Sequence, residues 1–288
     1  MKAPSFSYER AKSVANAIEL LARHGPDAQI LAGGQSLMPM LNFRVARPAV
    51  LVDINAIADL AAIRVDKKGV FIGALARHAD IERSGEIAEQ LPLVAAAMPH
   101  IAHPAIRNRG TFGGSCALAD PAAELPACCV ALGAEFRIAG PKGERSVPAD
   151  KFFAGVYTTA LQPGEILLGA QFPPRQAGYV SRFMELTRRH GDYAMVGAAA
   201  HGRLDKGRLS DLKFVYFAAG DRPIQARELT RVVEGKPLDA ATIDAAVAAL
   251  KEDLDPPGDL HASSALKRHL AGVIARRMLN EYATHKGA

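Results

Sequence analysis

The sequence predicts an α+β protein with two domains, and three observations lead to this expectation. The 288 residues are 49% hydrophobic and 23% charged, which is enough apolar material for more than one buried core. The first part mixes short strand-like runs with helical periodicity, whereas the second part has two long strand-like runs followed by helical sequence. Prolines and glycines cluster at Pro173, Pro174 and Gly178, so we expect domains over residues 1–175 and 176–288, the first with α+β subdomains of roughly 1–57 and 58–175.

Charge and hydropathy exclude several classes of protein. The 35 basic and 30 acidic residues leave a formal charge of +5, and the basic residues are scattered without interleaved aromatics, so no nucleic-acid binding is expected. No apolar run approaches the roughly 20 residues that span a bilayer, so no membrane span is expected. Residues 1–10 lack the apolar segment of a secretory signal, and we therefore expect a cytoplasmic protein.

The first domain is expected to open with a helix from Ser13 to His24, because its apolar residues recur at helical spacing. Ser13 is a typical N-terminal cap and Gly25 a typical stop. Short extended runs and one further apolar helical face come next in the chain. These patterns predict strands over 29–31, 50–54 and 70–74, and a helix over 36–43.

The remainder of the first domain is predicted as helices followed by a hairpin. An alanine-rich helix is expected over 86–101, with an interruption at Pro92. Asp120 followed by Pro121 indicates a helix start, since Asp caps the first turn and Pro fits the first helical position, and this helix should reach about residue 132. Residues 134–139 and 145–147 flank a Gly-Pro-Lys-Gly turn and should pair as strands.

The second domain is predicted to combine a small antiparallel sheet with a helical layer. Residues 196–204 and 209–219 are extended runs on either side of an Asp-Lys-Gly-Arg turn, which is typical of a hairpin. Everything after Arg227 has helical periodicity, most clearly 240–250 and 265–282.

Two glycine-rich loops are the most informative feature of the chain. Residues 32–36 read Ala-Gly-Gly-Gln-Ser, and residues 111–115 read Thr-Phe-Gly-Gly-Ser. Paired glycines let backbone N–H groups crowd around an anion, and the hydroxyls of Ser36 and Thr111 add further donors. We therefore expect a pyrophosphate between the two loops. Neither loop fits G-x-G-x-x-G, and G-x-x-x-x-G-K-[ST] does not occur, so neither a Rossmann nor a P-loop site is predicted.

The cysteines and histidines do not indicate a metal site. Cys116, Cys128 and Cys129 lack the C-x-x-C pairing and are interpreted as buried apolar side chains. Three thiols are too few for an iron–sulfur cluster, so any such cluster must lie on another chain. His100 and His103 have no carboxylate or cysteine at ligand spacing, and they are not expected to bind metal.

With both loops placed, the chain resembles the FAD-binding medium subunit of the molybdenum-containing hydroxylases, the group that includes carbon monoxide dehydrogenase and the xanthine dehydrogenase flavin domain. The resemblance spans essentially the whole length. It rests on residues 32–37 (AGGQSL), 106–115 (IRNRGTFGGS), 119–121 (ADP) and 191–194 (GDYA), in that order. It implies a two-part FAD-binding domain of the PCMH type and a smaller domain of antiparallel sheet plus helical bundle.

The resemblance also implies a role for each segment. The two loops would hold the FAD pyrophosphate, Asp120 would approach the polar chain of the cofactor, and Tyr193 would lie near the isoalloxazine ring. Two simpler interpretations stay open, namely that Asp120 only caps a helix and that Tyr193 is a buried core tyrosine. No catalytic or metal-ligating residue is implied on this chain. The implied cofactor-binding residues are Ala32, Gly33, Gly34, Gln35, Ser36, Leu37, Thr111, Phe112, Gly113, Gly114, Ser115, Asp120 and Tyr193.

The implied function is that of an oxidoreductase subunit that passes electrons from 2Fe–2S clusters through FAD to an external acceptor. The implied partners are a small iron–sulfur subunit and a large subunit with the molybdenum cofactor. Gln35 and Ser115 stand where the carbon monoxide dehydrogenase pattern usually has His and Asn, and residues 117–126 are closer to relatives that act on N-heterocycles or aldehydes, so such a substrate is expected. The alternatives are a carbon monoxide dehydrogenase medium subunit and a non-catalytic nucleotide-binding scaffold.

Overall fold

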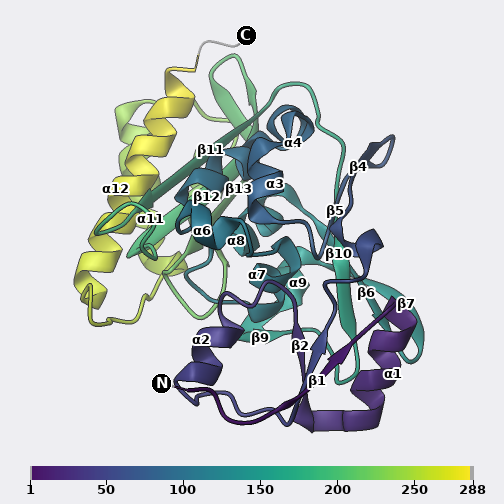
Figure 1. Ribbon diagram of the computed structural model, residues 1–288. Coiled ribbons are helices and arrows are strands. Elements are labelled where there is room, and N and C mark those ends of the chain that lie inside the picture. The colour runs from purple at the N-terminus through teal and green to yellow at the C-terminus, as the bar shows by residue number, and fades with distance from the viewer. Residues whose placement is uncertain (1, 286–288) are drawn as a thin grey trace.

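The computed structural model describes residues 2–285, and within them the chain forms an α+β fold built on several separate sheets. A small parallel sheet near the N-terminus lies at the bottom of Figure 1, a larger antiparallel sheet lies next to it, and the C-terminal sheet with helix α12 lies at the upper left. No described helix combines the length and the apolar character that a membrane crossing requires.

The N-terminal sheet places the first glycine loop at the end of a strand. Strand β3 lies in the middle and pairs in parallel with β1 on one side and β2 on the other. Ser13 caps α1 by accepting from Asn16 N, and the helix ends at Gly25, as predicted. The elements are β1 (Ser7–Arg10), α1 (Val14–His24), β2 (Ala28–Leu31), α2 (Leu37–Asn42) and β3 (Val50–Asp53).

The second subdomain is a five-stranded antiparallel sheet with helices packed against it. Its strands are β4 (Ile63–Asp66), β5 (Gly69–Gly73), β10 (Ile166–Phe172), β6 (Glu135–Gly140) and β7 (Gly143–Pro148), in that spatial order. The predicted hairpin is confirmed as β6 and β7. The helices are α3 (His78–Arg83), α4 (Gly85–Gln90), α5 (Pro92–Ala97), α6 (Pro104–Arg107), α7 (Phe112–Leu118), α8 (Glu124–Leu132) and α9 (Ala149–Phe152), and the short strands β8 (Phe153–Gly155) and β9 (Thr158–Thr159) form a separate pair.

Two helix predictions in this subdomain are wrong in detail. The single helix expected over 86–101 is divided into α4, α5 and a 3-10 turn, because Pro92 has no N–H to donate and instead occupies the first position of α5. Asp120 does not cap a helix. Its Oδ1 accepts from Ala122 N at 2.9 Å in a local turn, and α8 begins only at Glu124.

The C-terminal domain contains the predicted hairpin as its two longest strands. β11 (Tyr179–Leu186), β12 (Val196–Asp205), β13 (Arg208–Phe217) and β14 (Ile224–Gln225) form an antiparallel sheet in sequence order. The helices are α10 (Arg227–Val233), α11 (Ala240–Asp253) and α12 (Ser264–Ala283). Residues 254–263 are not helical, contrary to expectation, because two prolines and a glycine follow Asp255.

The C-terminal sheet is buried on both faces and joins the two domains. Ala199, Val215 and Phe217 belong to the core that surrounds α8, whereas Phe214 and Tyr216 face the core under α10, α11 and α12. Alternate residues of one strand point to opposite faces, so β13 serves both cores at once. Figure 1 shows α12 on the outer face of this sheet and α8 on the inner face.

Burial on both faces predicts that truncation on either side destabilises the protein. Phe214→Ala and Phe217→Ala remove rings that are fully buried on opposite faces, and each should lower the free energy of unfolding by about 3–5 kcal/mol. Leu260→Ala is the control, because this side chain is 99% exposed. Urea unfolding followed by circular dichroism measures the change. A cost below 1 kcal/mol for either phenylalanine variant would show that this face of the sheet is not packed as described.

Candidate functional site

The first glycine loop presents a row of free backbone donors. Residues 32–36 connect β2 to α2, and Gly34 has a φ of 73°, a left-handed conformation that glycine adopts at low cost. Among the described residues, the N–H groups of residues 33–36 have no hydrogen-bond acceptor. Ser36 directly precedes α2, yet its hydroxyl makes no capping bond. This loop can therefore direct several N–H donors and a hydroxyl at one anion.

The second glycine segment is built differently from the expected loop. Thr111 is the N-terminal cap of α7, and its Oγ1 accepts from Gly114 N at 3.1 Å. Phe112 N and Gly113 N donate to carbonyls of Ala76 and Ala74, at 2.9 and 2.8 Å. A Cβ on Gly113 would lie 2.4 Å from the Ala74 Cβ, so this glycine lets α7 approach the segment after β5. These N–H groups of the second segment are thus already hydrogen-bonded within the protein. This segment can border a ligand, but it does not offer a row of free donors.

The structure brings the two glycine segments into direct contact. A Cβ on Gly33 would lie 2.4 Å from the carbonyl oxygen of Arg109 and 3.0 Å from the Cα of Gly110, so only glycine permits this approach. Two side chains that sequence reasoning missed hold the contact in place. Asn55 Nδ2 donates to the Ala32 carbonyl at 2.9 Å, and Arg77 donates both to Asn55 Oδ1 at 2.5 Å and to the Arg109 carbonyl.

The same contact concentrates positive charge beside the free N–H groups. Burial and the neighbouring charge of Arg109 both lower the pKa of Arg77. An anion bound at the first loop would relieve this repulsion. Asn55 is the second residue after β3, and Arg77 is the fourth residue after β5. This position shortly after a strand is the only feature of the sequence that could have marked either residue as part of the site.

A buried histidine lies under the second segment. His78 is 5% exposed, and neither of its ring nitrogens has a hydrogen-bond partner in the described chain. Burial lowers its pKa to about 4, so the ring is neutral at physiological pH. A Cβ on Gly110 would lie 3.0 Å from His78 Nδ1, and this glycine therefore makes room for the ring.

Helix α7 leads from the two glycine segments to a cleft between the domains. Its seven residues span about 10 Å, and the chain then reaches Asp120 at the cleft wall. The cleft has a volume of about 650 Å³. It is lined from the first domain by Asp120, Pro121, Ala122, Val156 and Tyr157, and from the second by Arg188, Gly191, Asp192, Tyr193, Ala194, Met195, Ala218, Gly220, Pro257, Asp259, His261 and Lys267.

Two tyrosines from different domains flank Asp120 in this cleft. Tyr157 donates to Asp120 Oδ2 at 3.3 Å and has a φ of 50°, which is unusual for a bulky side chain. Tyr193 is 63% exposed, so the interpretation as a buried core tyrosine is wrong. Partial desolvation where the ring lies against the cleft wall, together with the charges of Asp120 and Glu124, raises the pKa of Tyr193 to about 12. Both phenols are therefore neutral hydrogen-bonding groups.

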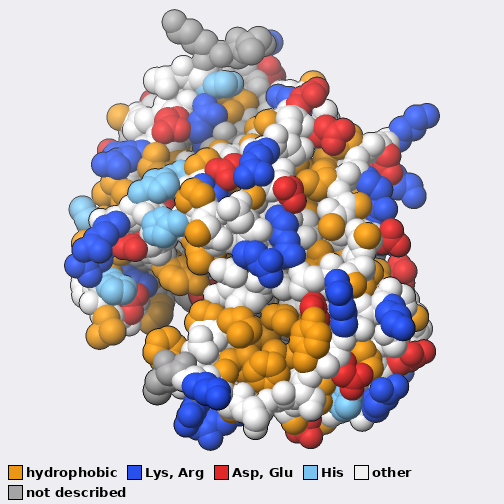
Figure 2. All heavy atoms as spheres, viewed as in Figure 1, with side chains coloured by type: hydrophobic (Ala, Val, Ile, Leu, Met, Phe, Trp, Pro, Cys, Tyr) orange, Lys and Arg blue, Asp and Glu red, His pale blue; other side chains and the backbone are white. Residues whose placement is uncertain are grey.

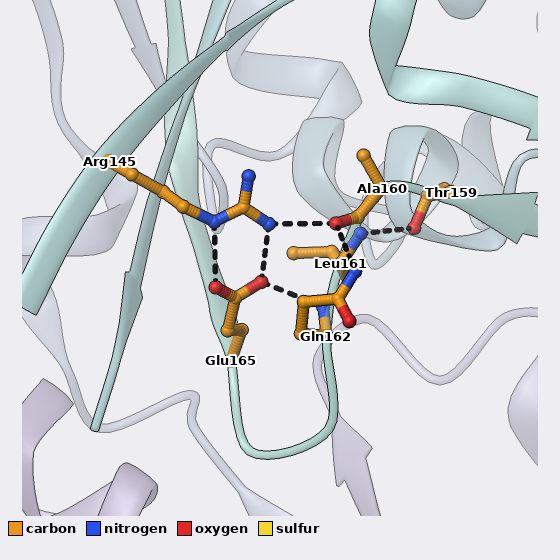
Figure 3. A network of polar contacts seen from close by, with 6 residues as sticks. All are labelled: Arg145, Thr159, Ala160, Leu161, Gln162 and Glu165. Atoms are coloured by element: carbon orange, nitrogen blue, oxygen red, sulfur yellow. Dashed lines mark hydrogen bonds and ion pairs between the residues drawn. The ribbon is translucent and has the colours of Figure 1, made fainter. Parts of the chain in front are cut away.

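The wall that carries Tyr157 is held by an ion pair behind it. Arg145 on β7 donates to both carboxylate oxygens of Glu165, at 2.7 and 2.6 Å, and to the Ala160 carbonyl at 2.7 Å (Figure 3). Gln162 N also donates to Glu165, at 2.7 Å. Hydrogen bonding to Arg145 lowers the pKa of Glu165, so the pair stays charged over the neutral range. This network fixes the segment after β9 and with it the turn that bears Tyr157.

The opposite wall is tied down by a buried lysine. Lys267 of α12 is 5% exposed, lies 2.7 Å from Asp259 Oδ2 and donates to the Ala218 carbonyl at 3.2 Å. The bond from Lys267 lowers the pKa of Asp259 to about 2. The irregular segment 254–263 is thereby anchored against the end of β13, where it closes one side of the cleft. Sequence reasoning predicted neither Lys267 nor Asp259 at the site.

The arrangement fits one elongated ligand with an anionic centre and a flat aromatic end. Free N–H donors, Ser36 and nearby arginines suit phosphates at the glycine contact. The cleft at the other end of α7 suits a ring with polar edges, because it combines two tyrosines with Asp120 and apolar walls. The observation that fits a pyrophosphate best is the row of N–H groups over residues 33–36, which have no acceptor among the described residues and lie where Gly33 packs closely against Arg109 and Gly110.

Comparisons with known proteins agree with this geometry over both domains. Residues 4–175 match the family described as FAD binding domain in molybdopterin dehydrogenase, and residues 181–282 match the CO dehydrogenase flavoprotein C-terminal domain. The 6-hydroxypseudooxynicotine dehydrogenase complex subunit alpha of Paenarthrobacter nicotinovorans is 41% identical, with 97% of this chain and 95% of that protein covered. The carbon monoxide dehydrogenase medium chain of Hydrogenophaga pseudoflava is 36% identical, with 96% of each chain covered.

Solved structures match as closely. A chain of quinoline 2-oxidoreductase from Pseudomonas putida 86 superimposes with a TM-score of 0.93 and 38% identity, and 98% of each chain is covered. A chain of the Hydrogenophaga pseudoflava carbon monoxide dehydrogenase that lacks the Mo-pyranopterin moiety gives a TM-score of 0.94 and 37% identity, with 97% of this chain and 98% of that chain covered. The chain therefore belongs to the family of FAD-binding medium subunits of molybdenum-containing hydroxylases.

Proposed function

We propose that this chain binds one FAD non-covalently, with the pyrophosphate at the glycine contact and the isoalloxazine ring in the interdomain cleft. The observation that carries the proposal is the row of free N–H groups over residues 33–36, held against Arg109 and Gly110. Gln35 Nε2 donates to the Gly33 carbonyl at 3.1 Å and so helps to hold the loop in shape. Ala32, Leu37 and Ser115 are proposed to adjoin the phosphates, whereas Phe112 and Gly113 are buried behind the site and Thr111 with Gly114 caps the adjoining helix. Asp120, Tyr157 and Tyr193 line the ring end.

Bound FAD would accept electrons from a partner and pass them to an external acceptor. The protein's own part is to bind, orient and shield. The first loop holds the phosphates, Asp120 accepts hydrogen bonds at the cleft wall, and the neutral phenols of Tyr157 and Tyr193 cover apolar surface while offering O–H groups. Burial of Lys267 and its pairing with Asp259 keep the opposite wall in place.

The chain is proposed to act with a small subunit that carries 2Fe–2S clusters and a large subunit that carries the molybdenum cofactor. Figure 2 shows apolar side chains gathered over the region where Figure 1 draws α2, β2 and β9. Phe43 and Val45, just after α2, are 67% and 75% exposed, which fits a surface that another subunit covers. We assign the complex to the cytoplasm, where free thiols such as Cys128 stay reduced. We place the boundary between the two domains of the chain between residues 175 and 176.

The substrate is proposed to be an N-heterocycle or an aldehyde, with carbon monoxide as the alternative. Relatives named for 6-hydroxypseudooxynicotine, caffeine, glyceraldehyde and carbon monoxide are 41%, 36%, 34% and 36% identical to this chain. Similar medium subunits thus serve complexes with different substrates, which fits a substrate site on the large subunit rather than on this chain.

A visible absorption spectrum of the purified chain tests the proposed function directly. We expect the absorption bands of oxidised flavin, their bleaching on reduction with dithionite, and release of FAD to the supernatant after acid precipitation. A colourless chain that also fails to take up added FAD would overturn the proposal. Flavin that stays in the precipitated pellet would show covalent attachment instead.

Substitution at Gly33 should weaken FAD binding strongly. The new Cβ of Gly33→Ala would meet the Arg109 carbonyl at 2.4 Å and force the two segments apart. The displaced N–H groups would no longer converge on the pyrophosphate, and loss of one hydrogen bond to a charged group costs about 1.5–3 kcal/mol, which is roughly 10- to 150-fold in the dissociation constant. Gly85→Ala is the matched control, since nothing lies within 4 Å of its Cβ position. Isothermal titration with FAD, together with circular dichroism for folding, separates loss of binding from loss of structure, and unchanged affinity of Gly33→Ala would remove the contact from the site.

Tyr193 should control the surroundings of the ring while leaving the phosphates in place. Tyr193→Ala opens the cleft wall, so we expect FAD content near that of the natural chain but altered flavin fluorescence and a changed rate of reoxidation by an external acceptor. Tyr193→Phe keeps the ring and should stay close to the natural fluorescence. Identical fluorescence and reoxidation in all three proteins would place the flavin ring away from Tyr193.

A further inference from the structure

Two glutamates are buried where the first domain meets the C-terminal sheet. Glu124, the first residue of α8, is 6% exposed, and the side chain of Glu185 on β11 is 3% exposed. Glu185 Oε2 has no hydrogen-bond partner among the described residues. A buried carboxylate without compensation is costly, so this pair requires a physical explanation that FAD binding does not supply.

A histidine connects the pair to the surface. His100 Nδ1 lies 3.2 Å from Glu185 Oε1, and the ring packs on Phe183 with centroids 5.1 Å apart. The His100 side chain is 37% exposed, and the His190 ring lies 6.1 Å from it. The hydrogen bond to Glu185 raises the pKa of His100. His100 thus links the buried Glu185 carboxyl group to the surface of the protein.

The groups that act electrostatically on Glu124 are mostly acidic. Glu185 on β11 and Asp120 in the turn before α8 favour its protonated form, whereas His100 acts in the opposite direction. The Cys128 thiol, one turn along α8, and the Tyr193 phenol in the cleft also sense the charge of Glu124. Burial and then the charges of Glu185 and Asp120 raise the pKa of Glu124 to about 8, although its own backbone N–H and His100 act in the opposite direction. Glu124 is therefore mostly protonated at neutral pH.

We propose that Glu124 is a positioning residue whose protonated form allows the first domain and the C-terminal sheet to close on each other and so sets the width of the interdomain cleft. This inference rests on the proposed function, because the cleft is the site assigned to the isoalloxazine ring. α8 packs on β12 and β13, and Ala218 N at the end of β13 donates to the Pro121 carbonyl at 2.8 Å, so the cluster and the cleft wall share one interface. Ionisation of Glu124 places a carboxylate charge in this buried interface, where desolvation makes it costly, and the two domains then separate more easily.

The direction in which pH changes the stability follows from the difference in the pKa of Glu124 between the unfolded and the folded chain. An ordinary glutamate has a pKa of 4.5, and the folded chain keeps the proton of Glu124 up to about 8. The folded state therefore holds more protons than the unfolded state over this interval, and the free energy of unfolding falls as pH rises from about 4.5 to about 8. Glu124→Gln keeps the shape and the hydrogen-bonding capacity but removes the titration, so this part of the pH dependence disappears.

The test measures thermal unfolding and FAD affinity of the full chain at pH 5.5, 7.0 and 8.5. We expect the melting temperature of the natural chain to fall with pH more steeply than that of Glu124→Gln, and its FAD dissociation constant to rise several-fold over the same range while that of Glu124→Gln stays flat. Glu135→Gln is the control, because Glu135 is exposed on β6 and should behave like the natural chain. Glu185→Gln removes the second buried carboxyl group and should also reduce the pH dependence.

Each outcome decides one part of the inference. A pH dependence of unfolding that is unchanged in both Glu124→Gln and Glu185→Gln would overturn the protonated cluster. A reduced dependence of unfolding, with an FAD affinity that still changes with pH as in the natural chain, would overturn the link to the cleft. If none of the proteins binds FAD at any pH, the proposed function fails, and the unfolding curves still decide whether Glu124 holds the proton.

Discussion

The site depends on the approach of two stretches of main chain, at Gly33 and at Arg109–Gly110. This approach joins the end of a strand in the parallel sheet to the segment that precedes α7, so the backbones of the two subdomains come into direct contact at the site. Arg77 and Asn55 hold this contact together, because their side chains form a chain of hydrogen bonds from the Arg109 carbonyl to the Ala32 carbonyl. Because these hydrogen bonds engage carbonyl groups and leave the N–H groups of residues 33–36 without an acceptor in the described chain, the first loop can serve as a preformed anion site.

The C-terminal sheet is buried on both faces, and this burial fixes the position of the second domain relative to the first. β12 and β13 contribute to the core around α8 and to the core under the C-terminal helices. Each wall of the interdomain cleft is also held by an ion pair. Arg145 pairs with Glu165 behind one wall, and Lys267 pairs with Asp259 behind the other. Such anchoring suits a cofactor ring that must stay aligned while electrons pass.

Much of the fold could be predicted from the sequence, because caps, stops and turns act locally. Ser13 and Gly25 bound α1 as predicted, and the Asp-Lys-Gly-Arg turn separates β12 from β13. The errors came from tertiary context. Asp120 and Pro121 look like a helix start, but the left-handed Ala119 that ends α7 leaves them in a turn at the cleft wall. Residues such as Asn55 and Arg77 carry no motif of their own, and their partners lie far away in the chain, so only the structure could reveal them.

A crystal structure of the chain with bound FAD would show whether the first loop holds the phosphates. We expect pyrophosphate oxygens within hydrogen-bonding distance, about 3 Å, of the backbone nitrogens of residues 33–36, with the ring between Tyr157 and Tyr193. The contact between Gly33 and Arg109 should persist unchanged, since the site is preformed. Phosphates bound away from the first loop, or a ring outside the interdomain cleft, would show that the glycine contact is not the cofactor site.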